Sequence, residues 1–227
     1  MTDKPRFAVL LSGCGVFDGA EIHEAVLTLL AIDRQGAVYQ CFAPDISQMH
    51  VIDHVTGEPT GETRNVLTEA ARIARGAIAD LATFDPGDFD ALILPGGFGA
   101  AKNLCTFAVD GPDCTVDPTV EAALTKARAF HLPIGALCIA PAVLARVLGT
   151  GKLTIGSDKD AAAGIEAMGA THQEATHGEI VVDEGLRVVT SPCYMLDATI
   201  SQIAEGADNT VAALMRMVQQ GQPQTAA

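Results

Sequence analysis

The sequence has few cationic and aromatic side chains and no tryptophan. Its 14 Lys and Arg residues stand against 28 Asp and Glu, which gives a formal net charge of -14 over 227 residues. Nucleic acids and anionic membranes attract basic surfaces, so this imbalance argues against both as partners. Aromatic residues make up 4% and hydrophobic residues 48% of the chain. We therefore expect a core of Ala, Val, Leu and Ile, as in layered α/β proteins.

The chain also lacks the patterns of disulfide-rich and membrane proteins. Its six cysteines include no Cys-x-x-Cys pair, which favours reduced thiols over a disulfide framework. It has no internal repeat and no transmembrane run. Residues 7–14 superficially resemble a lipoprotein signal, but their apolar core is shorter than the roughly 7–15 residues that a signal peptide uses. We therefore expect a first strand there and a cytoplasmic location.

Strand and helix patterns alternate along the chain and predict one α/β domain over residues 1–227, with an ordered core at about 6–218. Helical spacing predicts helices at 19–35, 65–75, 116–130, 142–148, 161–168 and 197–218. Continuous apolar runs predict buried strands at 7–11, 37–42 and 91–94, and shorter strands at 51–52 and 152–155. A hairpin is expected at 179–190, around Glu184 and Gly185.

Residues 132–141 carry the pattern on which the functional interpretation depends. A buried strand delivers Cys138 to a turn, and a helix that tolerates Pro141 in its first turn follows at once. At such a turn the side chain projects above the sheet, beside backbone N–H groups whose partial charge favours the thiolate. The alternative is that Cys138 is a small buried core residue.

A glycine-rich segment, PGGFGAAKNL at residues 95–104, follows another buried strand. Its paired Gly96 and Gly97 would let the backbone approach a ligand closely and aim N–H groups at it. The alternatives are an ordinary tight turn and a phosphate loop. Neither G-x-x-x-x-G-K-[ST] nor G-x-G-x-x-G is present, so a nucleotide site is disfavoured.

Three segments closely resemble the ElbB family, in the PfpI-like branch of the class I glutamine amidotransferase superfamily. They are LSGCGVFDGAEIHE at 11–24, LPGGFGAAKNL at 94–104 and ALCIAP at 136–141. The resemblance implies a flavodoxin-like three-layer αβα sandwich with a mostly parallel sheet and a nucleophile-elbow cysteine. ElbB proteins are described as glyoxalases without a cofactor. We therefore expect a small-molecule aldehyde substrate, no cofactor and a homodimer.

The resemblance also implies site residues. Cys138 would be the nucleophile, and a glutamate twelve positions before the helix-closing Gly36 would be its partner, which gives Glu24. Glu21, one helical turn earlier, is the competitor, and a solvated helix-start acid is the alternative for either glutamate. The backbone N–H groups of Gly97 and Ile139 are expected to stabilise an oxyanion. Further residues expected in the pocket are Gly96, Cys14, Glu21 and His23.

The positions of the histidines argue against a peptidase, an amidotransferase and a metal site. Peptidase-like relatives follow the cysteine with a histidine, where this chain has Ile139, so Cys–His proteolysis is disfavoured. Amidotransferases use a downstream His-x-Glu, which His177-Gly178-Glu179 fits, but it lies too early in the chain and a polar turn is the favoured interpretation. His50 and His54 are four residues apart in a segment that does not look helical, so we expect no metal.

The interpretation that follows is a glutathione-independent glyoxalase, which converts glyoxal to glycolate, or methylglyoxal to lactate, through a cysteine hemithioacetal. Glu24 would move the proton. We expect a small pocket for two- or three-carbon aldehydes and a Cys138 pKa below the ~8.5 of free cysteine. One alternative is a redox or stress-responsive protein with an oxidisable Cys138. Another is an amidotransferase-like subunit that needs a partner.

Overall fold

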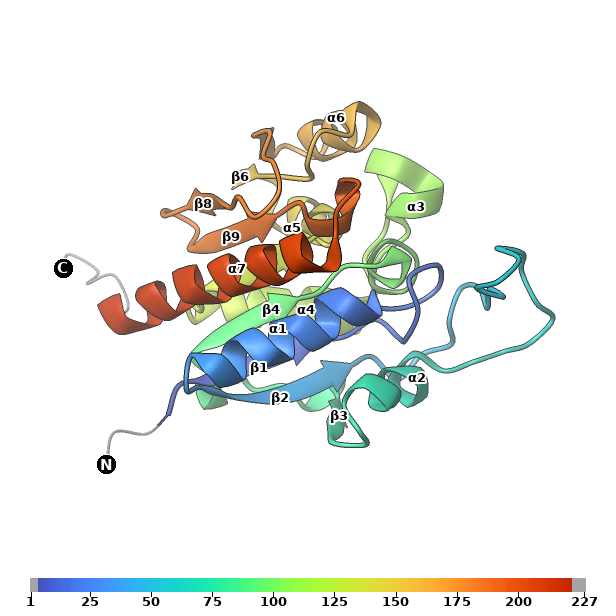
Figure 1. The fold of residues 1–227 in the computed structure, drawn as a ribbon, viewed down its shortest axis with the longest axis horizontal. Coiled ribbons are helices and arrows are strands. Elements are labelled where there is room, and N and C mark those ends of the chain that lie inside the picture. The colour runs from blue at the N-terminus through green and yellow to red at the C-terminus, as the bar shows by residue number, and fades with distance from the viewer. Residues whose placement is uncertain (1–3, 222–227) are drawn as a thin grey trace.

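The computed structural model (Figure 1) describes residues 4–221 and confirms the predicted α/β sandwich with a mostly parallel sheet. Seven strands lie in the order β3-β2-β1-β4-β5-β9-β8, and only β8 runs antiparallel to its neighbour. These strands are β1 (Arg6–Leu10), β2 (Val38–Ala43), β3 (Ile78–Asp80), β4 (Ala91–Leu94), β5 (Ile134–Leu137), β8 (Val181–Asp183) and β9 (Val188–Ser191). Residues 1–3 and 222–227 of the predicted domain lie outside the described part.

Helices cover both faces of the sheet (Figure 1). One apolar layer contains α1, α2 and α7, and the other contains α4 and α5. The short α3 and α6 border the pocket described below. The helices are α1 (Ile22–Arg34), α2 (Val66–Ile73), α3 (Phe107–Asp110), α4 (Pro118–Ala129), α5 (Pro141–Leu148), α6 (Lys159–Ala167) and α7 (Ile200–Gln220).

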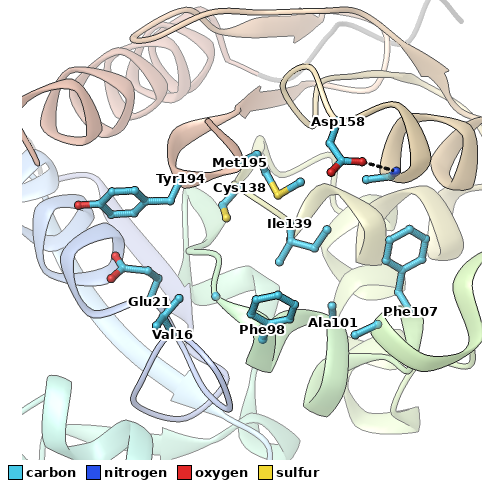
Figure 2. A pocket seen from close by; sticks show the side chains of 13 residues that line it. Val16, Glu21, Phe98, Ala101, Phe107, Cys138, Ile139, Asp158, Tyr194 and Met195 are labelled. Carbon is cyan, nitrogen blue, oxygen red and sulfur yellow. Dashed lines mark hydrogen bonds between the residues drawn. The ribbon is translucent and has the colours of Figure 1, made fainter. Parts of the chain in front are cut away.

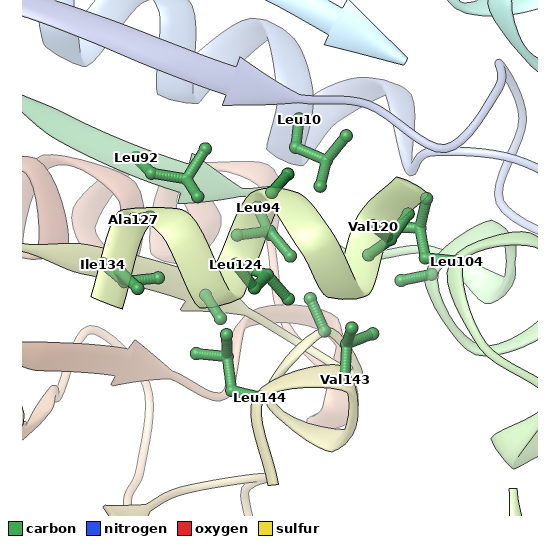
Figure 3. Packing of buried hydrophobic residues seen from close by; sticks show 14 of the residues in the cluster. Leu10, Leu92, Leu94, Leu104, Val120, Leu124, Ala127, Ile134, Val143 and Leu144 are labelled. Atoms are coloured by element: carbon green, nitrogen blue, oxygen red, sulfur yellow. The ribbon is translucent and has the colours of Figure 1, made fainter. Parts of the chain in front are cut away.

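The central strands are buried on both faces, which explains their unbroken apolar sequences. In β4, Ile93 faces the layer of α1 and α7, whereas Leu92 and Leu94 face the layer of α4 and α5. Figure 3 shows Leu92 and Leu94 gathered with Leu124 of α4 and Leu144 of α5. Burying each such side chain contributes about 1.5–3 kcal/mol, so these strands form a firm base for the loops at their ends.

The helices that reach the site have clear start and stop signals. Glu21 caps α1, because its Oε2 accepts a hydrogen bond of 2.7 Å from the Glu24 N–H. The helix therefore begins at Ile22, later than the predicted start. Pro141 opens α5, where its missing N–H has no helical partner to lose, and Gly149 closes it at φ +62°.

Other elements differ from prediction where the sequence signal is short. The strand at 51–52 is only an isolated bridge between Ile52 and Pro59, and β3 was not predicted, because three residues give no readable period. The strand at 152–155 is shortened to β6 (Lys152–Leu153), which pairs with β7 (Thr171–His172) in a separate two-stranded sheet. The hairpin of β8 and β9 is confirmed.

Candidate functional site

The candidate site lies at the carboxyl edge of the sheet, where β1, β4, β5 and β9 end. From β1 the chain runs outward to β2 and β3, and then crosses back to β4 on the other side of β1. The gap between β1 and β4 is therefore the switch point at which open α/β sheets bind ligands. Gly96 follows β4, Cys138 follows β5, and Tyr194 lies in the turn after β9. Glu24 reaches the same edge from the first turn of α1.

Cys138 stands in the strand-to-helix turn in a left-handed conformation, with φ +59°. Such a backbone costs about 1–3 kcal/mol in a residue with a Cβ, and residues of this kind cluster at functional sites. Its N–H donates to the Ser191 carbonyl at 2.9 Å, which fixes the turn to the end of β9. The residue is 7% exposed, and the backbone N–H groups of Gly97 and Ile139 are close enough to its sulfur to act on the thiol pKa.

Glu24 is fully buried beside this sulfur. Its Oε2 accepts the Gly96 N–H at 2.9 Å, its Oε1 accepts the Tyr194 N–H at 3.1 Å, and the carboxyl also hydrogen-bonds Cys138. Burial raises the pKa of Glu24 to about 8, with a smaller upward effect from Glu21, and the hydrogen bonds only partly offset this. The carboxyl is therefore mostly neutral at pH 7.

Glu21, the competing glutamate, has different contacts. Besides capping α1, its backbone N–H donates to the Gly96 carbonyl at 2.9 Å, and its side chain borders the pocket. The structure thus brings both glutamates to the site, but it is Glu24 that contacts the thiol. The two hydrogen bonds on Gly96, one to each glutamate, lock the glycine loop against α1.

Gly96 is required by close approach rather than by an unusual φ angle. A Cβ at this position would lie 2.6 Å from Glu24 Oε2 and would collide with the Cβ of Cys138. Gly97 has φ +97°, and a Cβ there would collide with the backbone of residues 19–21. The paired glycines therefore let the carboxyl and the thiol meet.

The expectation of a low thiol pKa is wrong. Burial raises the pKa of Cys138 well above its usual range, and the nearby Glu24 raises it further. The N–H groups of Gly97 and Ile139 lower it, but burial of the charged form outweighs these donors. The thiol therefore carries its proton at neutral pH.

A cavity of about 430 Å³ opens in front of Cys138 (Figure 2), larger than the expected pocket for two- or three-carbon aldehydes. Its walls are mainly apolar. Figure 2 shows the sulfur pointing into the space between Glu21, Ile139 and Phe98, with Phe107 further out. The lining residues are Val16, Glu21, Gly97, Phe98, Ala101, Phe107, Ala108, Cys138, Ile139, Asp158, Ala161, Tyr194 and Met195.

Three predicted pocket residues, Gly96, Cys14 and His23, are not among the lining residues, although Gly96 contacts Glu24. Cys14 is half-buried, and the charged groups that act on its thiol include Glu69 and Arg72 of the α2 region, because the loop after β1 turns that way. His23 has a 51% exposed side chain, and its Nδ1 lies 2.9 Å from the Tyr194 hydroxyl. The same Nδ1 lies 4.0 Å from Glu21 Oε1, so His23 stands behind Tyr194 and Glu21 and does not line the cavity.

Sequence reasoning missed the segment after β9. Tyr194 binds Glu24 through its backbone N–H, Met195 lines the cavity, and Cys193 packs with Cys138 in a small apolar cluster. The available signal was topological, because a parallel strand next to β5 must deliver its carboxyl end to the same edge.

The remaining histidines are elsewhere. His177 and Glu179 border a separate polar hollow together with Glu205 and Arg216, away from Cys138. His54 Nε2 accepts the Phe17 N–H at 3.3 Å. Within residues 4–221 no group of three or more His, Cys, Asp or Glu side chains could hold a metal ion. Over the same residues, no helix is long and apolar enough to span a membrane.

This fold and site define a class I glutamine amidotransferase-like protein. The chain is 48% identical to the human glutamine amidotransferase-like class 1 domain-containing protein 3, mitochondrial, over 94% of this chain and 82% of the relative. It is 46% identical to the rat ES1 protein homolog, mitochondrial, over 89% and 80%. The chain belongs to the family of these ES1 and amidotransferase-like class 1 domain proteins. No family model matches it.

Solved structures agree with the fold. An isoprenoid biosynthesis protein with amidotransferase-like domain from Ehrlichia chaffeensis is 35% identical, with a TM-score of 0.87, over 93% of this chain and 99% of that one. Glyoxalase III from Candida albicans is 15% identical, with a TM-score of 0.57, over 92% and 97%, and shares the fold.

The expected cytoplasmic location is corrected by the relatives. The human and rat proteins and the zebrafish ES1 protein are all mitochondrial by name, which points away from the cytoplasm. The composition that suggested a cytoplasm, reduced and dispersed cysteines in an acidic chain, does not separate it from a mitochondrial location.

Proposed function

We propose that the protein is a cofactor-independent glyoxalase of the ElbB type, with Cys138 as nucleophile and Glu24 as the group that moves protons. The observation that carries the proposal is the buried pair itself. A carboxyl with a pKa of about 8 hydrogen-bonds a thiol, and two backbone N–H groups point at the same sulfur. A glyoxalase III shares the fold, which supports this chemistry on such a scaffold.

The reaction begins with addition of the thiol to an aldehyde carbon. The ionised Glu24 takes the thiol proton as the C–S bond forms. The carbonyl oxygen becomes negatively charged and accepts hydrogen bonds from the N–H groups of Gly97 and Ile139. Glu24 then gives this proton to the oxygen, which completes the hemithioacetal and leaves the carboxyl ionised again. Because the thiol pKa is high, the proton leaves sulfur only in this concerted step, and the carboxylate is the base within reach.

The same carboxyl then moves one proton between the two carbons. It removes the C1 proton of the hemithioacetal and returns it to C2, which converts glyoxal-derived hemithioacetal to a glycolyl thioester. Water hydrolyses the thioester, which releases glycolate and restores the thiol. The sum is glyoxal plus water to glycolic acid, with no oxidant, reductant or metal. A pKa of about 8 suits a group that both accepts and donates near neutral pH.

The structure gives weaker support to the other interpretations. Ile139 occupies the position next to the nucleophile, so no histidine there can protonate a leaving amine. A peroxide sensor needs an accessible thiolate, whereas Cys138 is 7% exposed with a raised pKa.

The test is production of glycolate from glyoxal by the purified protein, without glutathione or added metal. We expect turnover in the wild type, none in Cys138→Ser, and a loss of about 10²–10⁴-fold in Glu24→Gln, the range for removal of a general acid–base group. Glu21→Gln is the matched control and should lose much less, because Glu21 does not contact the sulfur. Equal losses in both glutamate variants, or activity that survives Cys138→Ser, would overturn the assignment.

A further inference from the structure

The polar groups of the cavity in front of Cys138 are concentrated at the end that holds the sulfur. That end holds the thiol and the N–H groups of Gly97 and Ile139. The other polar side chains in the lining already have partners: Asp158 Oδ1 accepts the Ala161 N–H at 2.8 Å, and the Tyr194 hydroxyl lies 2.9 Å from His23 Nδ1. The described lining contains two carboxylates, Glu21 and Asp158, and each uses one oxygen to cap a helix, α1 and α6 respectively.

Apart from Asp158, the outer part of the cavity is apolar. Its surface is formed by Phe98 and Ala101 after β4, Phe107 and Ala108 of α3, and Ala161 of α6. In Figure 2, Phe98 and Ala101 lie on the far side of Ile139 from Cys138, and Phe107 lies further outward. Such a wall favours a substituent without polar atoms.

The volume of the cavity also favours a substrate with an apolar substituent. A volume of about 430 Å³ equals the share of roughly fourteen waters at ~30 Å³ each. Glyoxal has only four non-hydrogen atoms and would leave most of the cavity filled with water against apolar walls, which is unfavourable. The cavity is therefore built for a larger and less polar molecule.

From these observations we infer that the substrate is a 2-oxoaldehyde, R–CO–CHO, in which R is an apolar group of about four to eight carbon atoms. This inference rests on the proposed function and names the substrate class of the same site. The thiol bonds to the unhindered aldehyde carbon, so R starts at the next carbon and extends toward Phe107. The proton moves from C1 to C2, and water cleaves the thioester, which gives R–CHOH–COOH from R–CO–CHO and H₂O.

The experiment measures kcat/KM for glyoxal, methylglyoxal and straight-chain alkylglyoxals of increasing length, with the 2-hydroxy acid quantified by chromatography. Rates from Cys138→Ser are subtracted as background. We expect kcat/KM to rise roughly three- to fivefold for each methylene, the value for burying one CH₂, and to fall once R exceeds the cavity. A flat series, or one in which glyoxal is best, would overturn the inference while leaving the proposed function standing.

A variant pair locates the binding of R. Ala161→Phe fills the outer cavity. When each kcat/KM is divided by the value of the same variant with glyoxal, the chain length of R with the highest ratio should be several carbons shorter than in the wild type. Ala163→Phe places the same side chain on the exposed face of α6 and should keep the wild-type optimum. Identical optima in the two variants would contradict binding of R in this cavity. Absence of Cys138-dependent turnover with every member of the series would overturn the proposed function itself.

Discussion

Replacement of Glu24 by glutamine should change how stability depends on pH, by an amount that follows from the burial of the carboxyl. The folded protein raises the pKa of this group from 4.5 to about 8. A group with a raised folded-state pKa gives stability that is fully present below the unfolded pKa and is lost as the pH rises through the folded one. Between pH 5 and pH 8 the wild type should therefore lose about 3 kcal/mol from Glu24.

Glutamine cannot ionise, so Glu24→Gln avoids this loss. It has a separate and pH-independent cost of about 1–3 kcal/mol, because its NH₂ group faces one of two backbone donors, from Gly96 and Tyr194. Urea unfolding at pH 5, 6.5 and 8 separates the two effects. The variant should be the less stable protein at pH 5 and should gain about 3 kcal/mol on the wild type by pH 8.

The matched control is Glu58→Gln, which removes one negative charge from an exposed position. It corrects for the loss of one charge from a chain of net charge -14. If the unfolding free energies of wild type and Glu24→Gln ran parallel from pH 5 to pH 8, the carboxyl would not have the raised pKa on which the proposed reaction depends.

Three further predictions concern the thiol, the glycine loop and the outer face of α1. Alkylation of Cys138 by iodoacetamide should be slow at pH 7 and accelerate only above pH ~9, as followed by peptide mass spectrometry, and fast reaction at pH 7 would contradict a raised pKa. Gly96→Ala should lose activity and about 1–3 kcal/mol of unfolding free energy, because its Cβ collides with the carboxyl and thiol, and a fully active variant would argue against this close approach. The expected homodimer would use the exposed side chains of Ile22, Val26 and Leu30, so Val26→Glu should turn a dimer into a monomer in light scattering after gel filtration. A wild-type monomer would remove that expectation.

The sequence was informative where one local pattern decides the structure. Continuous apolar runs predicted the buried strands of the main sheet, and the strand-Cys-helix pattern placed Cys138 at the turn after β5. Glu24 was found only because the resemblance supplied a spacing to Gly36. From periodicity alone, Glu21 and Glu24 lie near the same helix face, and only the three-dimensional approach of Gly96 separates their contacts.

What the sequence could not supply depends on burial and on segments far apart in the chain. The Cys138 pKa was predicted in the wrong direction because the helix N-terminus is visible in the sequence, whereas desolvation is not. Tyr194 was missed because its contact with Glu24 spans 170 residues. The cavity was predicted too small, since the aromatic wall comes from Phe107 of α3, a helix of four residues with no readable period.

The most direct test of the central claim is capture of the covalent intermediate. Wild type, Glu24→Gln and Cys138→Ser are mixed with glyoxal, quenched in acid within the first turnovers, and analysed by intact-protein and peptide mass spectrometry. The account predicts one added glyoxal on the peptide that contains Cys138 in the wild type, less of it in Glu24→Gln because the carboxylate takes the thiol proton during addition, and none at that position in Cys138→Ser. Glycolate formation with no adduct at Cys138 in either of the first two proteins, or with the adduct on another cysteine, would contradict it.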